Sequence, residues 1–191
     1  MTQVLKACTP EQWLAAVLQD FDEFLNDHAA NERKASAMAM SMVAHYPDKP
    51  KLLAEMLDLA LEELGHYRQV MKLMLARGIT PSPDEKDPYV NQLIKRIRKG
   101  SGVYFLDRLL SGAVIEARGA ERFKLIADAH KDKSMRRFYE SLARSEAGHH
   151  EMFLNLASVY FETEVVNARW QEWLTIEAEV MLDLPIRARL H

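Results

Sequence analysis

One pattern of glutamates and histidines occurs twice in this chain and constrains its fold more than any other feature. Each copy has a single glutamate, a gap of about 30 residues, and then the sequence Glu-x-x-His. The gap is 31 residues from Glu32 to Glu63 and 30 residues from Glu116 to Glu146. Random placement of these residue types would give about 0.6 Glu-x-x-His matches, so the matched gaps carry more weight than the motifs themselves.

The single glutamates and the two Glu-x-x-His sequences all fall in segments with helical periodicity. Residues three positions apart share a face of a helix, so each Glu-x-x-His sequence directs a carboxylate and an imidazole towards one point. Two such pairs, with one glutamate from each of two further helices, form the ligand set of a di-iron or di-manganese site in a four-helix bundle. The predicted ligands are Glu32, Glu63, His66, Glu116, Glu146 and His149.

The register of the two motifs has an alternative. Glu62 with His66, and Glu146 with His150, are paired at a spacing of four residues, and their gaps match as well. We prefer the three-residue spacing because it is that of the known carboxylate bundle. Any one of these residues, taken alone, is more simply explained as an ordinary surface glutamate or histidine of a helical protein.

Apolar residues at helical spacing predict an all-α fold with a ferritin-like four-helix bundle. The four bundle helices are expected at about residues 20–46, 48–78, 103–130 and 132–160. A proline-rich loop and a short helix at 89–99 lie between the second and third of them, and such a long crossover is typical of the ferritin-like topology.

Extra terminal helices are also expected. The first begins after Thr9 as its N-cap, and the last covers about 162–182. The whole chain, 1–191, is long enough for one domain with its own core, and the tail from Pro185 is expected to be mobile. Gly112 stands one turn before Glu116, where either room beside a metal ion or close packing of two helices would explain it.

The composition bounds the class of protein. No apolar run reaches the roughly 20 residues that a bilayer requires, and the segment from Met1 to Lys6 has no apolar stretch of the signal-peptide type. The only cysteine, Cys8, excludes an internal disulfide and a four-cysteine iron site in this chain, and it fits a cytoplasmic protein. The formal charge of −3 argues weakly against nucleic acid, but two divalent ions would bring it to +1.

The ligand set indicates redox chemistry. Carboxylates with one imidazole per ion suit iron or manganese better than zinc or copper. A pair of ferrous ions can give two electrons to dioxygen, and an apolar pocket keeps the resulting oxidant from water. The chain has no iron–sulfur or flavin motif, so the electrons must come from an external donor. We therefore expect two iron ions as cofactor, with O2 as co-substrate.

Three stretches of the sequence carry a resemblance to a known family. The segment from Asp27 to Ala37, with Glu-Glu-Leu-Gly-His-Tyr at 62–67 and Ser-Glu-Ala-Gly-His-His at 145–150, resembles the tRNA 2-methylthio-isopentenyl-adenosine hydroxylases. The resemblance extends from about Glu11 to about Trp173 and includes all six predicted ligands. It implies a ferritin-like di-iron monooxygenase that hydroxylates the isopentenyl group of a modified adenosine next to the anticodon of tRNA. Because the chain has no electron-carrier motif of its own, we also expect an external electron-donor protein as a partner.

Two basic clusters, at 95–99 and 131–144, give modest independent support for tRNA as the partner. Phosphate contacts need such clusters, although solvated helix surfaces are often as basic. A modified base must also leave its stack to reach a buried metal. The predicted tRNA-binding residues are Lys95, Arg96, Arg98, Lys99, Arg136 and Arg137.

Three other functions share some of these features. A ferroxidase or iron-storage protein has the same ligand set but assembles into a cage, for which the proline-rich loop and the basic clusters have no obvious use. A rubrerythrin-like peroxide reductase needs a four-cysteine iron domain, and this chain has only one cysteine. A binding module with an acidic bundle would hold no iron. The sequence leaves open the electron donor, the choice of tRNAs, the oligomeric state and the residues that contact the prenyl group.

Overall fold

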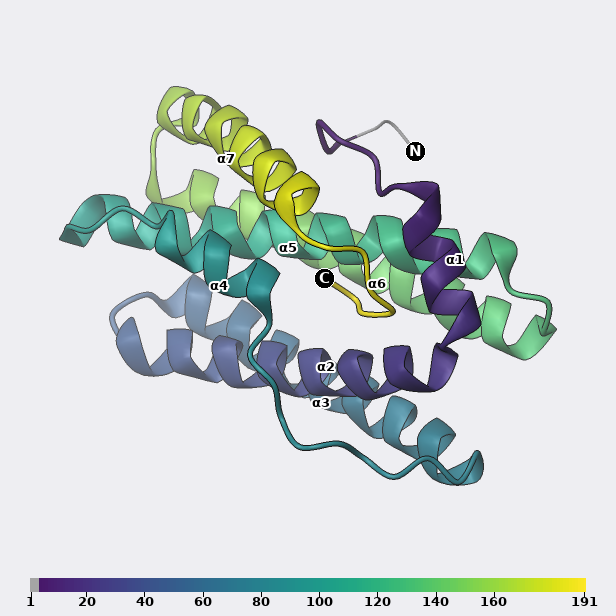
Figure 1. Cartoon of the computed structure of the whole chain (residues 1–191). Helices are drawn as coiled ribbons and strands as arrows, with labels where there is room; N and C mark the ends of the chain where they lie inside the picture. The colour runs from purple at the N-terminus through teal and green to yellow at the C-terminus, as the bar shows by residue number, and fades with distance from the viewer. Residues whose placement is uncertain (1–3) are drawn as a thin grey trace. The chain divides into compact units, whose positions relative to one another are not determined.

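The computed structural model describes residues 4–191, and every regular element in this range is an α-helix (Figure 1). The predicted bundle helices correspond to α2, α3, α5 and α6, whose ends lie within two residues of the expected bounds. The segment from Met1 to Lys6 has no apolar stretch of the signal-peptide type, and its first three residues lie outside the described range. The helices are α1 (Glu11–Gln19), α2 (Phe21–His45), α3 (Pro50–Ala76), α4 (Pro88–Lys95), α5 (Ser101–Ala129), α6 (Lys133–Tyr160) and α7 (Thr163–Asp183).

Local sequence sets most of these helix ends. The Asp20 carboxylate accepts a hydrogen bond from the third backbone N–H of α2, and Asp132 caps α6 in the same way. Pro50 opens α3, where a missing N–H costs nothing. Gly78 and Gly100 follow α3 and precede α5 with φ angles of 72° and 121°, which favour glycine. Within residues 4–191, none of the helices has the length and apolar character that crossing a bilayer requires.

Two expectations about helix ends are wrong, and long-range contacts explain both. The short helix α4 ends at Lys95 rather than Lys99, because the backbone N–H of Arg98 donates to the Asp107 carboxylate of α5 at 2.8 Å instead of to a helix carbonyl. Thr9 does not cap α1 with its side chain. Its hydroxyl donates to the Glu121 carboxylate at 2.6 Å and so ties the N-terminal segment to α5.

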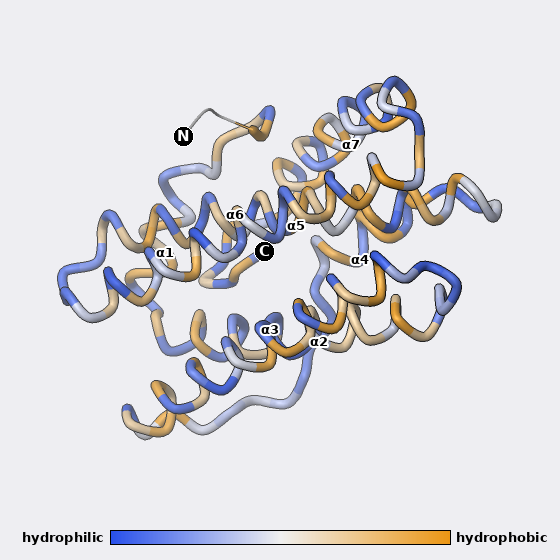
Figure 2. The backbone as a smooth tube through the Cα atoms, turned by 180° about the vertical axis from the view of Figure 1, so that it is seen from behind, coloured by the Kyte–Doolittle hydropathy of each residue, from blue (hydrophilic) through white to orange (hydrophobic). Residues whose placement is uncertain are grey.

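The described residues divide into two compact units. One contains the N-terminal segment to Leu14, Lys86–Ile186 and His191, and the other contains Ala15–Glu85 and Arg187–Leu190. The first unit is built on the helix pair α5 and α6, against which α4 and α7 also pack, and the second is built on the pair α2 and α3. Figure 2 shows hydrophobic and hydrophilic residues alternating along these helices, as amphipathic helices require. The single domain expected for 1–191 remains a prediction.

Helix α5 is buried along most of its length and packs tightly against α6. A Cβ atom at Gly112 would lie 2.9 Å from Cζ of Phe153, which is too close for an unshifted side chain. The space that glycine leaves is therefore filled by the Phe153 ring. Of the two explanations left open for Gly112, close packing of two helices is the one that holds.

The side of α5 that bears Arg118 is held by a buried ion network. Arg118 is fully buried, and its guanidinium donates to both carboxylate oxygens of Glu177 on α7, at 2.7 and 2.9 Å. Tyr89 of α4 donates to the same carboxylate at 3.0 Å, and burial raises the pKa of Tyr89. Arg118 also donates to the carbonyl of Ala7 at 2.9 Å. A buried charge needs such partners, so this network fixes α5 only two residues beyond Glu116.

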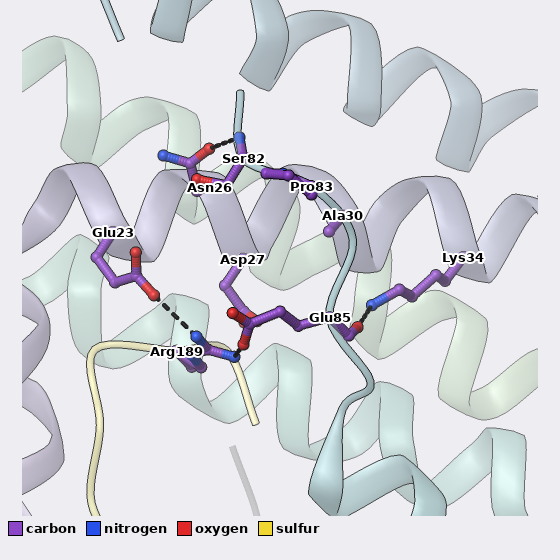
Figure 3. A pocket seen from close by; sticks show the side chains of 9 residues that line it. All are labelled: Glu23, Asn26, Asp27, Ala30, Lys34, Ser82, Pro83, Glu85 and Arg189. Atoms are coloured by element: carbon purple, nitrogen blue, oxygen red, sulfur yellow. Dashed lines mark hydrogen bonds and ion pairs between the residues drawn. The ribbon is translucent and has the colours of Figure 1, made fainter. Parts of the chain in front are cut away.

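The C-terminal tail is held in place, so the expectation of a mobile tail is wrong for these residues. The Arg189 guanidinium donates to Glu23 of α2 at 3.0 Å and pairs with Glu85 of the proline-rich loop at 2.7 Å. The backbone N–H of Leu190 donates to the Asp27 carboxylate at 2.8 Å. Figure 3 shows these side chains around a small pocket between α2, the loop and the tail. Charge-assisted hydrogen bonds of this kind order a segment that has little apolar surface.

Candidate metal centre

Three of the predicted ligands converge in the unit of α2 and α3. Glu32 on α2, with Glu63 and His66 on α3, offers ligand atoms that lie within 4.8 Å of one another. Nδ1 of His66 is 3.6 Å from Oε2 of Glu32 and 3.5 Å from Oε2 of Glu63. All three residues are buried. Two carboxylates and an imidazole gathered at one buried point form a donor set that suits a metal cation.

The charges of this half-site support the same conclusion. Burial by itself would lower the pKa of His66, but the carboxylates of Glu32 and Glu63 raise it to about 10. Burial raises the pKa of Glu32, against the opposing effect of the neighbouring His28 and His66 imidazoles. The half-site thus strongly favours a positive charge between its carboxylates. A metal ion would supply that charge in place of the proton on the imidazole, so the residues fit an ion.

The other three predicted ligands converge in the unit of α5 and α6. Glu116 on α5, with Glu146 and His149 on α6, offers ligand atoms within 4.8 Å of one another, and all three are buried. Nδ1 of His149 is 3.7 Å from Oε2 of Glu116. A Cβ atom at Gly119 would lie 3.4 Å from Oε2 of Glu146, so a larger side chain there would crowd this carboxylate. The ligand types and their burial repeat those of the first half-site.

The geometry favours the three-residue register of both motifs. Glu62 is half exposed and its carboxylate is 3.8 Å from Nε2 of His66, whereas Glu63 is 1% exposed and lies with the other ligands. His150 is also buried, but its Nδ1 lies 2.8 Å from the carbonyl oxygen of Ala113. Because a carbonyl only accepts, Nδ1 of His150 must carry the proton. His150 therefore bonds α6 to α5, in a position distinct from the ligand group.

Sequence reasoning missed one residue of the site, His28. It is fully buried, and its Nε2 lies 2.6 Å from Oε1 of Glu32. The Phe24 ring packs beside it, with ring centroids 5.7 Å apart. The available signal was its position one turn before Glu32 on the same inward face. A residue bonded to a ligand fixes the direction of that ligand, so His28 orients the Glu32 carboxylate.

The first basic cluster lies at the end of α4 and is partly committed to structure. The guanidinium of Arg98 bonds both carboxylate oxygens of Asp107, at 3.1 and 2.9 Å, and Arg169 bonds them from α7 at 2.8 and 2.7 Å. Burial would raise the pKa of Asp107, but Arg169 and Arg98 lower it to about 2. Arg96 is half exposed, 3.8 Å from Glu179. Arg98 thus has a structural role as a bidentate partner of Asp107.

The second basic cluster lies at the turn between α5 and α6. Arg136 and Arg137, with Lys133, line an open pocket of about 450 Å³ that also includes Asp128 at the end of α5. Asp107 and Asp128 are 21 residues apart on α5, which corresponds to about 30 Å along the helix axis. The structure therefore places the two clusters at opposite ends of α5 and does not bring them together as one surface.

The chain is similar to several known proteins. A family model described as tRNA-(MS[2]IO[6]A)-hydroxylase (MiaE) matches residues 1–191. A Pseudomonas putida protein named tRNA 2-(methylsulfanyl)-N(6)-isopentenyladenosine(37) hydroxylase is 40% identical over 152 residues, which cover 80% of this chain and 74% of that protein. A Salmonella typhimurium protein of the same name is 33% identical over 165 residues, which cover 86% of this chain and 60% of that protein.

A solved structure is also similar over nearly the whole chain. It is described as protein 43 with aldehyde deformylating oxygenase activity from Synechococcus. It has a TM-score of 0.93 and 33% sequence identity, and the match covers 99% of this chain and 96% of that one. The all-α, ferritin-like fold class expected from the sequence is confirmed.

Proposed function

The chain belongs to the MiaE family of tRNA hydroxylases, and from this premise we propose that it is an oxygen-dependent di-iron monooxygenase acting on tRNA. Its substrate is 2-methylthio-isopentenyl-adenosine next to the anticodon, and the isopentenyl group receives the oxygen. The observation that carries the proposal is the doubled half-site of two glutamates and one histidine, buried in both helix pairs.

The six buried side chains would hold two iron ions. Glu32, Glu63 and His66 offer donors for one ion, and the matching residues of α5 and α6 offer donors for the other. Carboxylate oxygens with a single imidazole per ion suit iron. Bound ferrous iron would supply the two electrons that dioxygen needs to insert one oxygen atom into a C–H bond, while the second oxygen atom leaves as water with two protons.

The residues of this chain orient those ligands. His28 holds Glu32 at 2.6 Å, and the hydrogen bond from His150 to Ala113 fixes α6 against α5 beside His149. Phe153 fills the space above Gly112 and excludes water there. An external donor must return two electrons per turnover, because a single cysteine cannot hold an iron–sulfur cluster and the chain has no flavin motif. We propose a separate electron-transfer protein for this role.

The basic clusters support tRNA binding at two separate points. We assign phosphate contacts to Lys95, Arg96 and Lys99 at one end of α5, and to Arg136 and Arg137 at the other. Arg98 was predicted to join them, but its bidentate bond to Asp107 favours a structural role. Two clusters about 30 Å apart suit an extended polynucleotide backbone better than a small anion. Glu116 lies between them on α5, so both clusters flank its half-site.

The similar Synechococcus structure favours a second candidate reaction, the oxygen-dependent removal of the formyl group from an aldehyde. Deformylation of an aldehyde would leave the two basic clusters without a use. We therefore rank this reaction below tRNA hydroxylation. Incubation of the iron-loaded protein with aldehydes, a reductant and O2 tests it directly. Alkane formation faster than tRNA hydroxylation would reverse the ranking.

Oxygen labelling of the tRNA product tests the proposed function. The iron-loaded protein, a reductant and prenylated tRNA are incubated under 18O2, and the nucleosides are analysed by mass spectrometry. We expect the modified adenosine to gain one 18O atom under labelled gas and none from labelled water in normal gas. Incorporation from water alone would contradict the monooxygenase assignment. Glu116→Gln, which keeps the size of the side chain but removes its charge, serves as the inactive control.

A further inference from the structure

The three tryptophans of the chain have different surroundings. Trp13 and Trp173 are buried, and each has an arginine guanidinium over its ring, at 4.8 and 5.5 Å from the ring centroid. Trp170 is partly exposed, and its indole packs against the imidazole of His150, with ring centroids 5.4 Å apart. Trp170 therefore differs from the other two in both its exposure and its neighbour.

These surroundings decide how easily each indole gives up an electron. A guanidinium lies favourably over a neutral ring, but it repels the positive charge that oxidation leaves there. Oxidation of Trp13 and Trp173 is therefore unfavourable. Because Trp170 is partly exposed, solvent can accept the N–H proton that an oxidised indole releases. Trp170 is thus the tryptophan best placed to be oxidised.

His150 connects Trp170 to a ligand of the candidate metal centre. It follows His149 directly in the chain and is buried with it in the unit of α5 and α6. Its Nδ1 donates to the carbonyl of Ala113, three residues before Glu116 on α5, at 2.8 Å. A continuous series of contacts and covalent bonds therefore leads from the surface of α7 to this half-site. Since α7 supplies none of the six candidate ligands, hydroxylation itself gives Trp170 no role.

We propose that Trp170 gives electrons, one at a time, through His150 to the oxidised di-iron centre when no tRNA is bound. The inference rests on the proposed function, because the iron and O2 of that reaction supply the oxidant. Each transfer removes one electron from the indole, whose N–H proton passes to solvent. A thiol in solution then returns a hydrogen atom to the indole radical, and two thiyl radicals join as a disulfide.

The electron count closes after two such transfers. In hydroxylation the C–H bond of the substrate supplies two electrons, and the iron pair supplies the other two that O2 needs to reach the level of water. Without tRNA, two electrons from Trp170 and two protons from solvent take the place of the C–H bond. The oxygen atom that the prenyl group would have received then leaves as water. The path thereby protects the ligands, His149 among them, from oxidation.

Oxidation of the full-length protein in the absence of tRNA tests the proposal. The ferrous-loaded protein is mixed with O2 without thiol, freeze-quenched samples are examined by electron paramagnetic resonance, and peptides are analysed by mass spectrometry. We expect a tryptophan radical, followed by a gain of oxygen atoms at Trp170 but not at Trp13 or Trp173, which serve as controls within the same molecule. Iron-free protein treated in the same way should show neither signal.

Two variants separate the path from simple exposure of the indole. His150→Gln keeps an N–H donor for the carbonyl of Ala113 but removes the ring beside Trp170. At matched iron content, its oxidation of Trp170 should fall to the level of the iron-free protein. Trp170→Phe should retain its iron and its initial rate of tRNA hydroxylation, but exposure to O2 and reductant without tRNA should inactivate it faster than the wild type.

Four results would overturn the proposal: no tryptophan radical in the wild type, equal oxidation of all three tryptophans, undiminished oxidation of Trp170 in His150→Gln, or a Trp170→Phe protein that is inactivated no faster than the wild type. Hydroxylation of tRNA without oxidation of Trp170 would refute this path and leave the proposed function intact. Iron-dependent oxidation of Trp170 in a protein that does not hydroxylate tRNA would support the path and refute the proposed function.

Discussion

The two half-sites have the same three ligand types but are built by different means. In the α2 and α3 pair, polar contacts set the geometry: Nε2 of His28 lies 2.6 Å from Oε1 of Glu32, and the His66 imidazole lies between the carboxylates of Glu32 and Glu63. In the α5 and α6 pair, glycine and packing set it. Gly119 leaves room for Glu146, and Gly112 admits the Phe153 ring. The first half-site should therefore respond to protons and to hydrogen-bonding substitutions, and the second to changes of side-chain volume.

The largest expected effect is the loss of a ligand from either half-site. Glu116→Ala should remove about half of the bound iron and all measurable hydroxylation, because oxygen chemistry that needs two electrons requires both ions. Glu32→Ala should do the same from the other half. Iron analysis and nucleoside mass spectrometry measure the two effects. Full activity in either variant would show that the residue is not a ligand.

A smaller effect is expected at His28. His28→Phe keeps a ring but removes the hydrogen bond to Glu32, and we expect iron affinity to fall about 10- to 100-fold. His28→Gln retains an N–H donor and should recover part of that loss. Competition with a chelator measures both affinities. Equal losses in the two variants would mean that ring packing, rather than the hydrogen bond, is what matters.

The stability of the iron-free protein should depend on pH through the same half-site. The pKa of His66 is raised to about 10 in the folded protein, so its stabilising effect is complete below the unfolded value of about 6.5 and is lost as the pH rises through about 10. Glu32, whose pKa is also raised, acts in the same direction. Chemical unfolding at several pH values should show stability falling over that window. A His66→Gln protein with the same fall would contradict this origin.

The α5 and α6 pair should instead be sensitive to volume. Gly112→Ala places a Cβ atom against the Phe153 ring, and we expect the crowding to outweigh the gain in helix propensity and to cost about 1–2 kcal/mol. Gly148→Ala is the matched control on α6, where a Cβ atom would meet nothing within 4 Å, and it should be neutral or stabilising. Thermal unfolding compares the two. A Gly112→Ala protein as stable as the control would refute close packing at this point.

The smallest expected effect concerns tRNA. Neutralising Arg136 and Arg137 together should weaken tRNA binding and lower the log–log salt slope by about 1.5, since each lost phosphate contact removes one released counterion. Arg98→Ala should instead lower the melting temperature, because it leaves Asp107 with fewer partners. Filter binding at several salt concentrations separates the two. An unchanged slope in the Arg136 and Arg137 variant would show that this cluster makes no phosphate contacts with tRNA.

The sequence predicts those features that are encoded locally. Asp20, Pro50, Gly78 and Asp132 fix helix ends through their own backbone preferences, which is why the long helices were placed within two residues. The ligand motifs are likewise local, because a three-residue spacing fixes the shared helix face.

The sequence could not predict features that depend on distant partners. The backbone N–H of Arg98 donates to Asp107 instead of continuing the helix, the Thr9 hydroxyl donates to Glu121, and Arg189 of the tail donates to Glu23. Each of these contacts brings together residues whose proximity follows only from the completed fold. Local patterns around Thr9 and in the tail therefore indicated a helix cap and a mobile end, and both indications were wrong.

Anaerobic titration of the metal-free protein with ferrous ions tests the central claim most directly, because the doubled pattern predicts a doubled binding capacity. We expect saturation at about two ions per chain for the wild type, and at about one for Glu116→Ala and for Glu32→Ala. Saturation of the wild type at one ion or none would contradict the account of two matching half-sites.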